Sequence, residues 1–524
     1  MTPRQRWTLV ATIIGSGAVF LDGTIINVAL PRIGQELPAT GVGVLEGQTY
    51  VVSGYLAVLA ALLILSGALS DHFGRRRIYS IGLASFAVTS ALCGLAPTME
   101  WLILFRLLQG AAGALLVPGS LALISGCFEG AERGRAFGIW AASTSALTLL
   151  GPLVGGALVD TAGWRIAFLI NVPVLAFALW ATRTYVVEST ELDRDGRFDW
   201  LGSVVAALAV GGLSIGLIRG QELEWQDPLA WAALALGVVA LIAFPILMAT
   251  RPHPLVPLRI FRSRAFATIN LATFFIYGAL YVTLSYQGLL LQGVLGYTAL
   301  AAGASGLPMG LCLVLLSTRI GTVAGRRGAR PFLVGGPLAM AAGLAWYVRL
   351  PVDSAPWRAT LSDPASLIPP RATVIDVLPA MLLFGIGISC VVAPLTSTLM
   401  GSIPGRSAAL GSAINNAISR VGQPLLGALI FIVVSASFYA TLGSLTGLDT
   451  TSSAVRETFQ PLNPPPAAAT VAQAAAARAA SVDAFHQAMA ACVVLLLVGA
   501  AVTWIGLRER HETVPASAPE ASAA

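Results

Sequence analysis

The amino-acid sequence predicts an all-α, polytopic membrane protein with 14 transmembrane helices, arranged as two six-helix bundles plus an inserted two-helix hairpin. Of its 524 residues, 56% are hydrophobic and only 11% are charged, whereas soluble domains carry about 25% charged residues. The mean hydropathy is +0.80. Apolar runs of roughly 20 residues, long enough to cross a hydrocarbon core of about 30 Å, recur along the chain. They lie near residues 7–30, 47–69, 78–96, 101–125, 134–158, 165–183, 199–219, 228–249, 265–291, 299–318, 331–350, 374–400, 407–438 and 483–506.

The distribution of arginine along the chain predicts the orientation of these helices. All 31 basic residues are arginine. With both termini in the cytoplasm, 21 arginines fall in inner segments, 8 fall in outer segments and 2 lie within the spans. Because cytoplasmic loops carry the excess of basic residues, we expect a multi-pass protein of the cell (cytoplasmic) membrane with both termini cytoplasmic. The same bias accounts for the net charge of +6 without a nucleic-acid partner.

A degenerate internal repeat divides the chain into two halves. GALSDHFGRRR (Gly67–Arg77) and TRIGTVAGRRGAR (Thr318–Arg330) are both Gly/Arg loops between two apolar runs on the predicted inner side. Two related halves are common in transporters. We therefore expect an N-terminal six-helix bundle at 1–183, a linker with two additional transmembrane helices at 184–264, a C-terminal six-helix bundle at 265–507 and a disordered cytoplasmic tail at 508–524.

Two long connections interrupt the second half. Residues 351–373 are rich in proline and charge, and residues 441–482 contain the tract NPPPAAATVAQAAAARAA. Both fall on the predicted outer side. We expect disordered or loosely helical external loops there, in preference to a lid over a ligand site.

The sequence gives no support for an enzyme or a metal centre. The five cysteines are scattered without a CxxC pair, and the four histidines stand in loops or near the ends of apolar runs. No HExxH or GxxxxGK[ST] motif occurs, so neither a zinc hydrolase nor ATP-driven export is indicated. We expect no catalytic residues, no metal and no cofactor.

Asp22 and Arg106 are charged residues within apolar runs, and Asp22 is the only acidic residue placed deep within one. Ionisable groups at membrane depth are functional candidates, because a charge there needs a partner or a water-filled cavity. A carboxyl group in such a place could load and release a proton, and pairing with Arg106 would favour its ionised form. The alternatives are a structural aspartate bonded to a neighbouring helix and an arginine that extends to the interface. Thr24 and Asn27 lie nearby as hydrogen-bond partners.

An aromatic and weakly polar face lies in the run 265–291. Asn270, Tyr277 and Tyr281 recur there at helical spacing. Such a face suits a lipophilic organic substrate, including a cation held by aromatic rings. Interhelical packing explains the same face equally well.

A second polar cluster lies in the run 407–438 and consists of Asn415, Asn416 and Arg420. Arg420 could bind an anionic group, or it could replace a proton site in coupling. The sequence leaves this choice open.

Four motifs stand in order along the first half. They are LDGTIINVALP (Leu21–Pro31) in the first span, GALSDHFGRRR after the second, FRLLQGAAGA (Phe105–Ala114) in the fourth and GPLVGG (Gly151–Gly156) in the fifth. WRIAFLINVP (Trp164–Pro173) follows them. In this order the segments resemble the major facilitator superfamily, specifically its fourteen-span branch of drug:proton antiporters. The resemblance covers nearly the whole chain.

The resemblance implies roles for particular residues. Asp22 and Arg106 would couple transport to protons, with Gln109 one turn from Arg106. The loop after the second span would act as a conformational latch that steadies the outward-facing state, or else only as a positive-inside anchor. The fifth span would form a close, bent seam that limits proton leak, or else only an ordinary packing face. The latch residues are Gly67, Asp71, Gly74, Arg75 and Arg76, and the seam residues are Gly151, Pro152, Gly155 and Gly156.

The expected function is therefore proton-coupled secondary antiport, which exports lipophilic drugs or antibiotics across the cytoplasmic membrane by alternating access. The expected partners are protons, a lipophilic small-molecule substrate and membrane lipids. The alternatives are a proton-coupled symporter or an exporter of an endogenous metabolite or lipid, and then a receptor or scaffold that transports nothing. The expected substrate cavity is lined by Thr24, Asn27, Gln109, Asn270, Tyr277, Tyr281, Asn415, Asn416 and Arg420.

Overall fold

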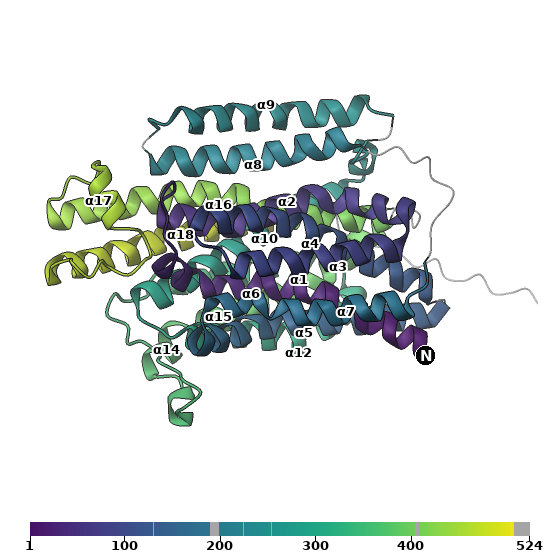
Figure 1. The fold of residues 1–524 in the computed structure, drawn as a ribbon, viewed down its shortest axis with the longest axis horizontal. Coiled ribbons are helices and arrows are strands. Elements are labelled where there is room, and N and C mark those ends of the chain that lie inside the picture. The colour runs from purple at the N-terminus through teal and green to yellow at the C-terminus, as the bar shows by residue number, and fades with distance from the viewer. Residues whose placement is uncertain (129, 189–198, 224, 253, 404–407, 508–524) are drawn as a thin grey trace, which may run out of the picture.

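Long helices run side by side through the whole molecule in the computed structural model (Figure 1). It describes residues 1–128, 130–188, 199–223, 225–252, 254–403 and 408–507, so the expected tail at 508–524 lies outside the described residues. Within these ranges the structure has no strand, and its one β-bridge joins Thr360 to Asp363. The predicted all-α class is confirmed.

The first half of the chain forms a group of helices around α1. This central helix packs against α4, α5 and α7, and α2 and α3 pack against α4. The bounds are α1 (Pro3–Glu36), α2 (Val44–Phe73), α3 (Arg75–Gly94), α4 (Met99–Cys127), α5 (Gly130–Ala162), α6 (Trp164–Leu169) and α7 (Asn171–Tyr185).

The second half forms a corresponding group around α10, which packs against α16 and α18. Its α-helices are α10 (Arg264–Leu289), α11 (Ala299–Ser305), α12 (Leu307–Arg327), α13 (Arg330–Tyr347), α14 (Arg371–Asp376), α15 (Leu378–Gly401), α16 (Ala408–Thr446), α17 (Ser453–Thr458) and α18 (Val471–Gly506). Short 3-10 turns lie at η1 (Leu258–Arg262) and η3 (Pro364–Leu367), and a π turn, η2 (Leu290–Val294), extends α10.

Two helices lie beside the bundle, α8 (Trp200–Glu222) and α9 (Pro228–Thr250) (Figure 1). α8 packs against α2 of the first half and α16 of the second, and α9 packs on the outer side of α8. Val239, Ile242 and Ile246 of α9 are mostly exposed. Such an apolar outer face suits contact with lipid chains rather than water.

The described residues include 12 helices that are long and apolar enough to cross a membrane. Each of the apolar runs predicted from the sequence overlaps a helix. Two of these helices, α5 and α13, are not among the 12. The protein is thus an all-helical, polytopic membrane protein.

The long connections are folded rather than disordered. Residues 351–373 contain η3, and the hydroxyl of Thr298 donates to the carbonyl of Ala359 at 2.8 Å. Residues 441–482 contain α17 and extensions of α16 and α18. These segments gather at one end of the bundle, where α5 ends and α11 begins, which we call the loop end. We call the opposite end, where α1 begins, the terminal end (Figure 1).

Candidate functional site

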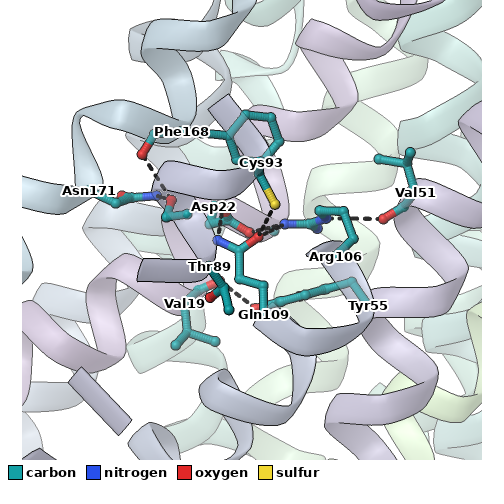
Figure 2. A network of polar contacts seen from close by, with 12 residues as sticks. Val19, Asp22, Val51, Tyr55, Thr89, Cys93, Arg106, Gln109, Phe168 and Asn171 are labelled. Carbon is teal, nitrogen blue, oxygen red and sulfur yellow. Dashed lines mark hydrogen bonds and ion pairs between the residues drawn. The ribbon is translucent and has the colours of Figure 1, made fainter. Parts of the chain in front are cut away.

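Asp22 lies in a buried polar cluster between α1 and α4 (Figure 2). Its side chain is 2% exposed and that of Arg106 is 0% exposed. Arg106 Nη1 donates to Asp22 Oδ2 at 2.5 Å, and Gln109 Nε2 donates to Asp22 Oδ1 at 3.1 Å. Arg106 Nη1 also donates to Gln109 Oε1 at 2.8 Å. Both carboxylate oxygens therefore have charged or polar donors inside the bundle.

Helix α2 supplies the other face of the Arg106 site. Arg106 Nε donates to the carbonyl of Val51 at 3.1 Å, and the Tyr55 ring lies 4.0 Å from Arg106 Cζ. Gly110 permits this close approach, because a Cβ there would lie 2.5 Å from the Tyr55 carbonyl oxygen. Arg106 Nη2 is buried and has no hydrogen-bond partner in the described ranges of the chain. The guanidinium is thus held on three sides, and the two N–H groups of Nη2 are unused by the described residues.

The next turns of α1 point elsewhere. Thr24 Oγ1 donates to the carbonyls of Phe20 and Leu21, and Thr24 packs against Gly151 of α5. Asn27 Oδ1 accepts from Ser285 Oγ of α10 at 2.8 Å. Asn27 therefore links the two halves of the chain, whereas Thr24 bonds to its own helix.

The second-half candidates form a separate network. Asn415 Nδ2 donates to Asn270 Oδ1 at 3.1 Å and to Thr273 Oγ1 at 2.9 Å. The rings of Tyr277 and Tyr281 lie 6.3 Å apart. Asn416 and Arg420 make other contacts. Asn416 donates to the carbonyl of Ser412 in its own helix, and Arg420 Cζ lies 5.6 Å from the Phe20 ring of α1.

The candidate seam on α5 packs against α11 at the loop end. A Cβ on Gly156 would collide with the carbonyl of Ala299, and a Cβ on Gly303 would collide with the carbonyl of Pro152. The two backbones meet directly, as small residues allow in membrane helices. Gly151 and Gly155 face α1 instead, against Thr24 and Ile25 respectively.

Asp160, near the end of α5, strengthens this seam. Its Oδ1 and Oδ2 accept from the backbone N–H groups of Ala299 and Leu300 at 3.1 and 2.7 Å. The carboxylate occupies the positive end of α11. The two halves are thus joined at the loop end by charge-assisted hydrogen bonds.

The candidate latch lies at the terminal end. Gly74 has a φ of +101°, which favours glycine. The backbone N–H groups of Arg76 and Arg77 donate to Glu188, so the carboxylate beyond α7 caps α3. Arg75 Nη1 lies 3.5 Å from the carbonyl of Ala122. Gly67 and Asp71 fall on α2 among residues whose side chains are outside the described part.

The family follows from the comparison with known sequences. Residues 12–427 match the model of the Major Facilitator Superfamily. The chain belongs to the Major Facilitator Superfamily. It is a membrane transporter of this family, and the superfamily predicted from the four motifs is confirmed.

Several proteins similar in sequence to this chain are named as antibiotic or multidrug resistance proteins. Puromycin resistance protein pur8 of Streptomyces alboniger is 31% identical over 518 residues, which cover 97% of this chain and 93% of that protein. Multidrug resistance protein Stp of Mycobacterium tuberculosis is 34% identical over 447 residues, covering 84% and 78%. Methylenomycin A resistance protein of Bacillus subtilis is 31% identical over 440 residues, covering 83% and 89%.

Solved superfamily structures share the fold. A bacterial homolog of the human lysosomal transporter Spinster, crystallised in an inward-facing and unoccupied conformation, has a TM-score of 0.64 at 18% identity and covers 97% of each chain. A D-xylose-proton symporter has a TM-score of 0.59 at 16% identity, covering 96% of this chain and 97% of that chain.

The sequence did not predict several polar contacts, both at the Asp22–Arg106 cluster and between the two halves of the chain. Tyr55 stacks on Arg106, and Cys93 Sγ donates to Gln109 Oε1 at 3.4 Å. Gln48 and Asn463 exchange two side-chain hydrogen bonds of 3.1 Å. The sequence did carry one signal for Tyr55 and Gln48, because each is a polar residue within an apolar run. Nothing in the sequence pairs residues 415 positions apart.

Proposed function

We propose that the chain is a proton-coupled antiporter that exports lipophilic small molecules across the cytoplasmic membrane by alternating access. The observation that carries the proposal is the Asp22–Arg106–Gln109 cluster, which buries an ionisable carboxyl group in a transporter whose relatives are drug resistance proteins. Moving one charge across 100 mV is worth about 2.3 kcal/mol, which supports modest accumulation per proton.

In this proposal, proton binding at Asp22 removes the charge that Arg106 neutralises. The ion pair then loosens, and Arg106 and Gln109 become free to adopt another arrangement. Coupling follows if substrate and proton favour opposite conformations, because a ligand shifts a conformational equilibrium only by its differential affinity. The carboxyl group tolerates its buried position because it is paired in one state and neutral in the other.

The proposed architecture is that of the fourteen-span branch, with α5 and α13 also crossing the membrane and α8–α9 inserted between two six-helix bundles. Both termini lie in the cytoplasm, so the loop end faces outward. The joined α5–α11 seam is then an outer gate in its closed state, and the loop at Gly74 to Arg76 is an inner latch. Asn27 and the Asn270–Asn415 network line the path between the halves.

A susceptibility and accumulation panel tests this proposal. An efflux-deficient bacterial host expresses the native chain, Asp22→Asn or a control, Asp483→Asn, whose carboxylate accepts from Ser437 and Thr441 away from Arg106. We expect the native chain and the control to lower accumulation of at least one lipophilic compound, and Asp22→Asn to lose most of that effect. Equal export by all three would remove Asp22 from coupling, and export of nothing by the native chain would reject the function.

A further inference from the structure

Arg420 is a buried cation on α16 with no counter-ion among the described residues. The residue is 6% exposed. It forms no hydrogen bond or ion pair with any described residue, and its Nε is buried without a partner. Its guanidinium reaches the Phe20 ring of α1, two residues from Asp22. The unpaired charge therefore lies between the two halves, near the coupling cluster.

Within the described part of the chain, no carboxylate forms an ion pair with Arg420. Asp22 already accepts from Arg106 and Gln109 on its two oxygens. Asp483 is the only acidic residue within the helices α10, α12, α13, α15, α16 and α18 of the second half, and it accepts from Ser437 and Thr441. A buried charge without a partner is strongly unfavourable, so the site calls for an anion from outside the chain.

Gln423 extends the site by one helical turn. It is 3% exposed, and no described residue donates a hydrogen bond to its buried Oε1. Together with Gln48 of α2 and Ser285 of α10, it lines a narrow cavity between the halves. Residues three apart share a helix face. Gln423 Nε2, the donor atom of this amide, can therefore donate to the same ligand as the guanidinium.

We propose that Arg420 binds an anionic group of the exported molecule, so that the preferred substrates are lipophilic acids rather than lipophilic cations. The inference rests on the proposed export function and specifies its substrate class. A guanidinium matches a carboxylate in geometry and charge, with two parallel hydrogen bonds. With Asp22 ionised, the described centre holds two arginines and one carboxylate, a balance that disfavours a cationic guest.

Charge-matched probes test the inference. Everted membrane vesicles from an efflux-deficient host carry the native chain, Arg420→Gln, Arg420→Lys or a control, Arg264→Gln, whose guanidinium bonds the carbonyl of Ile505 at the bundle periphery. The probes are fluorescein, rhodamine 123, and a set of lipophilic carboxylic acids with their methyl esters. We expect the native chain to transport acids in preference to their esters. Arg420→Gln should lower transport of the acids about ten-fold or more, with partial recovery in Arg420→Lys.

Three outcomes would overturn the inference. Transport confined to rhodamine 123 or to esters would leave the export function standing and reject the acidic substrate class. Equal loss of every probe in Arg420→Gln would assign Arg420 to the conformational cycle or to coupling instead. Transport of no probe and of no compound in the susceptibility panel would reject the proposed function, and this inference with it.

Discussion

Arg106 and Asp22 neutralise each other where neither charge would be stable alone. Both side chains are buried, and their shortest contact is 2.5 Å. The Tyr55 ring and the Val51 carbonyl hold the guanidinium in the orientation that meets the carboxylate. The pair is therefore held in place by its neighbours, as the proposed proton coupling requires.

Removing one partner should cost more stability than removing both. We expect Arg106→Gln to destabilise the protein by about 3 kcal/mol, because it leaves an uncompensated carboxylate. In the double variant Asp22→Asn, Arg106→Gln, part of the lost stability should return, because neither charge remains. The measurement is the apparent unfolding temperature of detergent-solubilised protein, with Arg264→Gln as the control. Strictly additive losses would show that the pair is not energetically coupled.

At the scale of the helices, α5 and α11 are joined by close backbone packing at Gly156 and Gly303 and by the hydrogen bonds of Asp160. The backbone of Gly303 lies against the Pro152 carbonyl, and the Asp160 carboxylate accepts from the first N–H groups of α11. This arrangement leaves no room for a side chain at Gly303. Closure of the loop end therefore depends on direct backbone contact.

A methyl group at Gly303 should open this seam. We expect Gly303→Ala to separate α5 from α11 and to raise the population of a state open at the loop end. The control is Gly335→Ala, because a Cβ there has nothing within 4 Å. Double electron–electron resonance measures the opening as the distance between two spin labels. The labels are attached to cysteines introduced at Thr161 and Leu361, in a chain whose native cysteines are replaced by serine. Unchanged distances in Gly303→Ala would contradict the account of the seam.

At the scale of the whole molecule, the two halves are tied together at the loop end and bridged along one side. Gln48 and Asn463 exchange paired amide hydrogen bonds across the halves. In α8, the carbonyl of Ile215 accepts a hydrogen bond from the Tyr50 hydroxyl of α2. The Ser214 hydroxyl of α8 donates to the carbonyl of Pro424 in α16. Rocking of one half against the other must break the amide pair and change at least one α8 contact.

The amide pair should act as a single unit in this motion. Replacing Gln48 or Asn463 by alanine should each raise the open-to-closed ratio at the loop end about thirty-fold, because each change removes both hydrogen bonds of the pair and each bond contributes about 1 kcal/mol net. The double variant should shift the ratio little further, since both changes remove the same interaction. The same spin-label distances measure the ratio. Additive shifts would mean that each residue acts through other contacts.

The sequence predicted the all-helical, polytopic architecture because the length of an apolar run reports a membrane-spanning helix directly. Asp22, Arg106 and Gln109 were predicted together from motif resemblance, and their contacts place them in one cluster. The capping of α3 by Glu188 was not predicted, because the carboxylate comes from a distant connection. In the loops at 351–373 and 441–482 the expected helical turns are present, and the expected disorder was wrong. Their order comes from tertiary hydrogen bonds, such as Thr298 to Ala359, that composition does not encode.

The central claim is that protonation of Asp22 couples substrate movement to the proton gradient. The direct measurement compares native and Asp22→Asn protein in proteoliposomes, using a compound identified by the accumulation panel. Two rates are recorded for each: accumulation driven by a pH gradient, and exchange of labelled for unlabelled compound without a gradient. We predict that Asp22→Asn loses gradient-driven accumulation but retains exchange. Accumulation by Asp22→Asn with the same dependence on the pH gradient as the native protein would contradict the account.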